Sequence, residues 1–202
     1  YDSYDDEVYR YSTAINNGSI TTRGEDAFGM LADYGSTVTN NSGGTITTHG
    51  NRAYGMYAWL GSNATNNGSI TTRGDYAFGM FAWLGSNATN NGSITTRGED
   101  AFGMYAMGYY AEDYYDSYDD EVYRYSTAIN NGNIITHGNR AYGMYAEGYY
   151  DYAEGKNTIT NNGTITTYGQ YAHGMYLYGS TGTNSGSIAV TGKGADAVYA
   201  DN

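Results

Sequence analysis

One motif recurs along almost the whole chain, and this repetition limits the possible folds more than any other feature of the sequence. Its most regular copy, residues 90–106, reads NNGSITTRGEDAFGMYA. The Gly-Met pair keeps a constant distance from the preceding isoleucine, whereas the connections between copies vary in length. A constant block with variable connections is typical of stacked coils that carry surface loops. Copies of about 24 residues are anchored by a recurring isoleucine, at Ile20, Ile46, Ile70, Ile94, Ile134, Ile165 and Ile188.

The residue types of the motif favour strands over helices. Thr, Ile, Tyr, Phe and Val are bounded by Asn-Gly and Gly, which is the chemistry of β-strands and tight turns. Helical repeats need units of roughly 33 to 47 residues, rich in Ala, Leu, Glu and Lys. The sequence therefore predicts an all-β fold, a right-handed parallel β-helix (β-solenoid). We expect about seven coils of ~24 residues each and a triangular cross-section.

Alternation along each strand predicts which side chains form the core. In the first coil the predicted inward residues are Ala14, Ile20, Thr22, Phe28, Met30 and Ala32. The predicted outward residues are Thr21, Ala27, Gly29 and Leu31. The recurring Asn-Gly pairs, such as Asn17-Gly18, are predicted to turn the chain between strands, since both residue types tolerate a positive φ.

Charge and composition exclude several classes of function. The formal net charge is −12, and an acidic surface repels phosphate backbones, so no nucleic-acid partner is expected. No apolar run approaches the roughly 18 residues that a membrane-spanning helix needs. The absence of Cys rules out disulfides. The aromatic content of 16% gives the chain apolar surface to bury, which argues against disorder.

Tandem blocks such as residues 90–106 resemble the passenger repeats of bacterial autotransporter and filamentous-haemagglutinin-like adhesins. The resemblance covers nearly the whole chain, from Ala14 to Ala200, and is specific for architecture rather than for ligand. It implies a right-handed parallel β-helix that is extracellular or at the cell surface. It also implies a role in adhesion, aggregation or matrix building.

We predict a single β-solenoid domain over residues 1–202. Residues 1–13 would form an incomplete first coil or loop, residues 107–125 a Tyr/Asp-rich insertion, and residues 147–157 a shorter insertion. The acids of the long insertion could supply oxygen ligands to Ca²⁺, a possible cofactor. Their spacing matches no EF-hand, however, and a run of acids is more typical of a solvated loop. The acids are Asp113, Asp116, Asp119, Asp120 and Glu121.

Self-assembly is one expectation from the ends of the sequence. Residues 1–18 are identical to residues 115–132, so the chain begins within a segment that elsewhere connects two coils. Head-to-tail contact between two chains would recreate a shortened form of that connection and build a fibre. The alternative is a segment of a longer rod. The predicted assembly ends are Tyr1, Tyr4, Tyr199 and Asn202.

Outward aromatic residues are the best candidates for contact with a partner. Such rings can stack on sugars or join neighbouring rods. The alternative is that they bind nothing and stabilise the sheet by stacking between coils. Two tryptophans, each in an identical AWLGSNAT stretch, indicate a local contact patch for glycans or surface proteins. The predicted patch comprises Trp59, Trp83, Tyr57, Phe81, Tyr105, Tyr145 and Tyr176.

A column of basic residues also faces outward. We expect the acids two or three residues later, such as Glu25 and Asp26, to offset the repulsion within it. The column comprises Arg23, His49, Arg73, Arg97 and His137, followed by Tyr168.

Enzyme activity is not expected. Parallel β-helices also house enzymes that act on polysaccharides, but these need a carboxylate pair or a metal–carboxylate cluster with a nearby base. The acids of this chain fall in repeated turns or in one loop, and no singular set breaks the repeat. The expected function is an extracellular structural or adhesive rod.

Overall fold

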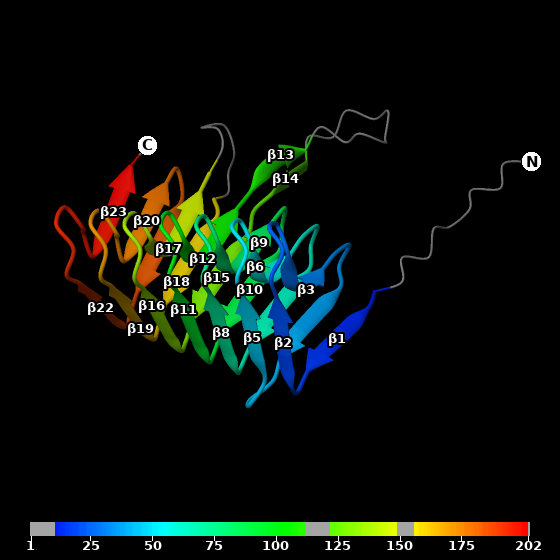
Figure 1. Ribbon diagram of the computed structural model, residues 1–202. Coiled ribbons are helices and arrows are strands. Elements are labelled where there is room, and N and C mark those ends of the chain that lie inside the picture. The colour runs from blue at the N-terminus through cyan, green and yellow to red at the C-terminus, as the bar shows by residue number, and fades with distance from the viewer. Residues whose placement is uncertain (1–10, 112–121, 149–155, 202) are drawn as a thin grey trace, which may run out of the picture.

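The computed structural model describes residues 11–111, 122–148 and 156–201, and all of their regular secondary structure is β-strand. Three parallel sheets of seven strands run side by side along the molecule, and each coil contributes one strand to each sheet, as Figure 1 shows. The predicted all-β parallel solenoid with three-sided coils is confirmed. Within the predicted insertion 107–125, β13 (Tyr109–Ala111) and β14 (Val122–Arg124) form a short antiparallel pair.

The strands follow one another in each sheet in the order of the coils. Sheet A contains β1 (Thr13–Asn16), β4 (Thr37–Asn40), β7 (Asn63–Asn66), β10 (Asn87–Asn90), β15 (Thr127–Asn130), β18 (Thr158–Asn161) and β21 (Thr181–Asn184). Sheet B contains β2 (Ser19–Thr22), β5 (Thr45–Thr48), β8 (Ser69–Thr72), β11 (Ser93–Thr96), β16 (Asn133–Thr136), β19 (Thr164–Thr167) and β22 (Ser187–Val190). Sheet C contains β3 (Phe28–Ala32), β6 (Tyr54–Ala58), β9 (Phe78–Trp83), β12 (Phe102–Met107), β17 (Tyr142–Glu147), β20 (Met175–Tyr178) and β23 (Val198–Asp201).

Neighbouring coils lie in register, so equivalent residues of the motif form columns along the rod. Ile94, for example, pairs with Ile70 on one side and Ile134 on the other. Neighbouring strands are about 4.8 Å apart, which sets the spacing of each column. The columns of Ile, Met and Ala meet in the interior, where Ile94, Met104 and Ala106 are fully buried. The predicted core columns of these three residue types are confirmed.

The predicted inward position of the Phe28 column is wrong. Phe78, its equivalent in β9, packs on the outer face of sheet C against Phe81. The glycine that follows faces the core instead, and a Cβ on Gly79 would lie 2.4 Å from Cγ2 of Ile94. Ala77, in the column predicted to face outward, is fully buried. The alternation of inward and outward side chains fails at this point. Gly79 is not paired with a residue of the neighbouring strand, and Gly79 and Met80 therefore both face inward.

The Asn-Gly turns need their glycine for a different reason from the one predicted. Gly68 and Gly92 have no positive φ. A Cβ on Gly92 would lie 2.0 Å from the carbonyl oxygen of Gly68, so close stacking of the coils excludes a side chain.

A buried ladder of side-chain amides supports the same turns. In a typical step, Nδ2 of Asn90 donates a hydrogen bond to Oδ1 of Asn130 at 2.8 Å. Both residues are fully buried. The ladder links all seven coils and comprises Asn16, Asn40, Asn66, Asn90, Asn130, Asn161 and Asn184.

The core is open at both ends of the described coils. Ala14 in the first coil is exposed, and Val198 in the last is 49% exposed, whereas their equivalents Ala88 and Met104 are fully buried. Both ends therefore present strand edges and apolar columns that a further coil would cover.

Candidate functional site

The outer face of sheet C, here called the aromatic face, carries three columns of side chains. The first contains Phe28, Tyr54, Phe78, Phe102, Tyr142 and His173. The second contains Leu31, Tyr57, Phe81, Tyr105, Tyr145, Tyr176 and Tyr199. The third contains Trp59, Trp83, Met107, Glu147 and Tyr178.

Rings of the aromatic face stack on one another from coil to coil. Phe78 and Phe102 have centroids 5.0 Å apart and planes 7° apart, and Phe81 and Tyr105 are 4.8 Å and 24° apart. Stacking in this direction covers the ring faces and leaves mainly the ring edges towards solvent. Tyr57, Phe81 and Tyr105 are only 7–8% exposed. The second column was expected to face solvent as a contact surface. This is wrong for its central members Tyr57, Phe81 and Tyr105, which form a second apolar cluster outside the core.

The two tryptophans of the predicted patch do lie together. Their ring centroids are 6.0 Å apart and their planes 20° apart, and Tyr34 lies against Trp59 at 6.0 Å. Met107 follows Trp83 in the same column. The indole N–H groups of both tryptophans are buried, and the described residues offer them no hydrogen-bond acceptor. Both tryptophans are half-buried. Glycan or protein binding at this patch stays a prediction.

Burial on the aromatic face changes the ionisation of its tyrosines. It raises the pKa of Tyr57 and of Tyr145 well above the ordinary value, since the charged phenolate is poorly solvated there. Glu147 accepts a hydrogen bond from Oη of Tyr105 and adds to the shift at Tyr145 through its negative charge. Both effects keep these hydroxyls protonated.

The outer face of sheet B, here called the polar face, has a different chemistry in the same coils. Its columns are mostly Ser and Thr, interrupted by Asn133, Ile135 and Ala189. In the central coils Ser69 pairs with Ser93 and Thr71 with Thr95, and all four are half-buried. At the edge of the sheet follow the basic residues, all of them exposed, which we call the cationic ridge: Arg23, His49, Arg73, Arg97 and His137.

The arginines of the cationic ridge are not paired as expected. Arg23, Arg73 and Arg97 make no ion pair with any described residue. The acids of the next turn pair instead with arginines of neighbouring coils: Arg52 binds both carboxylate oxygens of Asp26, at 2.7 and 3.0 Å. Glu25 and Asp26 thus form no direct ion pair with the ridge, because the turn directs these acids along its own column.

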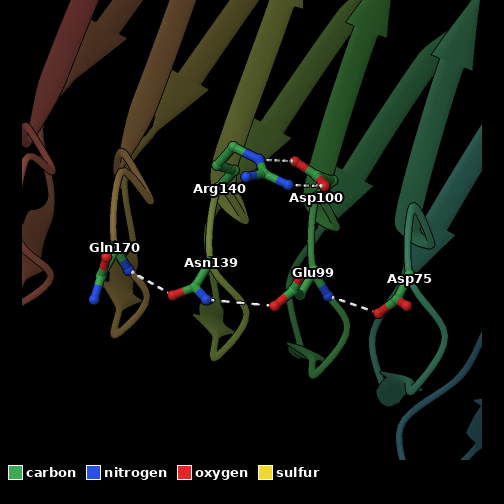
Figure 2. A network of polar contacts seen from close by, with 6 residues as sticks. All are labelled: Asp75, Glu99, Asp100, Asn139, Arg140 and Gln170. Carbon is green, nitrogen blue, oxygen red and sulfur yellow. Dashed lines mark hydrogen bonds and ion pairs between the residues drawn. The ribbon is translucent and has the colours of Figure 1, made fainter.

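Figure 2 shows this turn network in the central coils. Arg140 donates to both carboxylate oxygens of Asp100, at 2.6 and 2.7 Å, and the hydrogen bond holds the pKa of Asp100 below its ordinary value. One position earlier, the backbone N–H of Glu99 donates to Oδ1 of Asp75 at 2.9 Å. Asn139 in turn donates to Oε1 of Glu99 at 3.4 Å. Asp100 is thus paired with Arg140, and Asp75, Glu99 and Asn139 are joined to one another along the turn column.

Several predicted site residues lie outside the part of the chain that the structure describes. They are Tyr1, Tyr4, Asp113, Asp116, Asp119, Asp120, Glu121 and Asn202. Tyr199, the remaining assembly residue, lies in the last strand and is 37% exposed. Among residues 11–111, 122–148 and 156–201, no three His, Asp or Glu side chains gather as metal ligands would, and no helix could span a membrane.

Sequence reasoning missed two features, the buried amide ladder and the unpaired state of the ridge arginines. A signal existed for the first, because an asparagine precedes each Asn-Gly pair, as Asn90 precedes Asn91 and Gly92. The sequence held no signal for the unpaired ridge arginines, because ion pairing between coils depends on the direction that each turn gives its side chains.

Comparison with known proteins gives one family. A model of the BigA third pectate lyase-like domain matches residues 30–109 and, in a second overlapping match, residues 75–202. Comparisons with curated proteins and with solved structures found no match. The two family matches together span residues 30–202 and fall on the stacked coils, as a repeated motif would produce. This chain belongs to the family of the BigA third pectate lyase-like domain.

Proposed function

We propose that this domain is a structural rod of a bacterial surface adhesin, located outside the cell and without enzyme activity. The observation that supports this most directly is the continuous, in-register stacking of seven coils around a uniform core. Such an arrangement gives length and stiffness, and it repeats the same surface along the rod instead of building one singular site. Family membership and the resemblance to adhesin repeats support the same role.

The open end coils support extension of the rod by further stacking. Ala14 and Val198 lie in columns that are fully buried in the central coils, so a covering coil would remove apolar surface from water. The amide ladder also has a direction, since each Nδ2 donates to the next coil. The covering coil would belong to the same polypeptide or, in a fibre, to a second copy stacked head to tail.

Two measurements test this role. Antibodies raised against the purified chain should label intact, unpermeabilised source cells, and labelling only after permeabilisation would contradict a surface function. Negative-stain electron microscopy across a concentration series should show narrow filaments if copies stack head to tail. The variant Val198→Lys, which places a charge at the open end, should shorten them. Separate short rods at every concentration would reject stacking between copies and leave the rod as part of a longer chain.

A further inference from the structure

Among residues 11–111, 122–148 and 156–201, the cationic ridge is a strongly charged feature that the rod function does not explain. Arg73 and Arg97 occupy neighbouring coils, are exposed, and form no ion pair with the described residues. Like charges on neighbouring strands destabilise a sheet. The ridge therefore opposes folding slightly, and no described contact within the chain offsets this effect.

The backbone fixes the spacing of the ridge. The N–H groups of Arg73, Arg97 and His137 each donate to a threonine carbonyl of the preceding coil at 3.0 Å. Consecutive ridge residues are thus held about 4.8 Å apart, and the five positions from Arg23 to His137 extend over roughly 19 Å. The ring of Tyr168 stacks on His137 at 5.1 Å and ends the row. The backbone positions of the ridge therefore form a straight row parallel to the rod, from which exposed basic side chains extend.

The surroundings of the ridge leave these side chains available to a ligand. On one side the half-buried hydroxyl residues Thr71 and Thr95 lie next to each other, and Ile135 follows them in the same column. On the other side, in the turn that follows, Asp100 is paired with Arg140, and Asp75 accepts a hydrogen bond from the backbone of Glu99 instead of pairing with a ridge arginine. Acids more than a Debye length of about 8 Å from the ridge are screened at physiological salt, so only the turn acids beside it, such as Asp75 and Glu99, compete with a ligand for the arginines.

We propose that the cationic ridge binds a linear sulfated polysaccharide that lies along the rod on the polar face. Two adjacent guanidinium groups, at Arg73 and Arg97, can donate to one sulfate ester, which offers three terminal oxygens. A carboxylate offers two and matches a single guanidinium. The hydroxyls of Thr71 and Thr95 then face the sugar ring. The inference deepens the proposed adhesive function, on which it rests, by naming the chemistry that the rod would hold.

The experiment compares dextran sulfate with unsulfated dextran of the same length, titrated into the full chain by calorimetry. Dextran sulfate should bind, with an affinity that falls as salt is raised, and dextran should not. Arg73→Gln with Arg97→Gln should weaken binding about tenfold or more. The control Lys156→Gln with Lys193→Gln removes the same net charge from other exposed positions and should change affinity less than about twofold. His49→Arg with His137→Arg extends the fixed charges of the ridge and should tighten binding.

Each opposite result overturns the proposal. Equal weakening by both glutamine pairs would mean that net charge, not the ridge, determines binding. Equal affinity for polygalacturonate of similar charge density would reject the sulfate assignment, and equal affinity for duplex DNA would make the ridge a general polyanion site. Circular dichroism of each variant shows that the fold is retained. Surface labelling of cells is measured independently, so failure of the proposed function and failure of this inference are distinguishable.

Discussion

The outer faces of sheets B and C belong to the same coils but have opposite roles in the molecule. On sheet C, Phe81 is only 7% exposed because aromatic rings from neighbouring coils and columns cover it. On sheet B, the equivalent outward column carries Thr95, which is half-buried, and the ridge residue Arg97 is exposed. A three-sided coil with a core of Ile, Met and Ala is narrow. The aromatic face adds a second apolar layer outside it, and this leaves the polar face free for contacts with other molecules.

The difference can be expressed as buried area. A buried aromatic side chain removes about 150–250 Å² from water, several times what a threonine methyl group contributes. Stacked aromatic pairs add roughly 0.5–1.5 kcal/mol beyond that area. The aromatic face should therefore contribute to stability as a core does, and the polar face should contribute little.

The largest expected effect is on the aromatic face. Phe81→Ala should lower the free energy of unfolding by about 3–5 kcal/mol, the range for a buried phenylalanine, although Phe81 lies outside the core. Urea denaturation followed by circular dichroism measures this change. The control Tyr199→Ala changes the same column at the open last coil, where the ring is 37% exposed, and should cost clearly less. A Phe81→Ala change below about 1 kcal/mol would show that the aromatic face does not act as a second core.

The second-largest expected effect on stability distinguishes Asn90, in the buried amide ladder, from the adjacent exposed Asn91. Asn90→Ala removes a fully buried link, leaving the side-chain amides of Asn66 and Asn130 without one partner each. Each unsatisfied buried group costs about 1–3 kcal/mol. Asn91, the next residue, is exposed and bonds Asn67 at 2.9 Å on the surface. Asn91→Ala should change stability by less than about 0.5 kcal/mol, and equal losses for the two variants in urea titrations would contradict this assignment.

This pair of residues shows what the sequence could and could not predict. The repeat predicted the coils, the three strands and the columns of Ile94, Met104 and Ala106, because register and burial repeat with the motif. The buried asparagine could also have been predicted, because alternation from the inward Ala88 places Asn90 inside and leaves Asn91 in the turn, but this step was missed. The repeat misplaced Phe78, because alternation holds only where each residue is paired, and Gly79 is not.

Alkaline pH should weaken the aromatic face and not the polar face. The folded protein holds the pKa of Tyr57 and Tyr145 above the value of about 10 for an unfolded chain, so the unfolded state loses its protons first. Their stabilisation is complete below pH 10 and is lost progressively as the pH rises towards the folded-state pKa values. Urea midpoints measured from pH 8 to pH 11 should therefore fall above about pH 10.

A matched variant identifies these hydroxyls as the cause. Tyr57→Phe with Tyr145→Phe keeps the rings, and phenylalanine already occupies this column at Phe81. The double variant should lose less stability between pH 9 and pH 11 than the parent chain. An unchanged alkaline decline would assign the effect to other tyrosines.

The smallest expected effect is on the polar face. Thr71→Ala with Thr95→Ala removes two neighbouring hydroxyl side chains that are paired in register in the middle of sheet B. The backbone ladder beneath them is unaffected, because the N–H of Arg97 still donates to the carbonyl of Thr72. Each change should alter the free energy of unfolding by less than about 0.5 kcal/mol, and the two should add without coupling. A combined loss near that of Phe81→Ala would remove the distinction between the two faces. A neutral result, together with weaker binding of dextran sulfate by the double variant, would show that residues of the polar face contribute to contact rather than to folding.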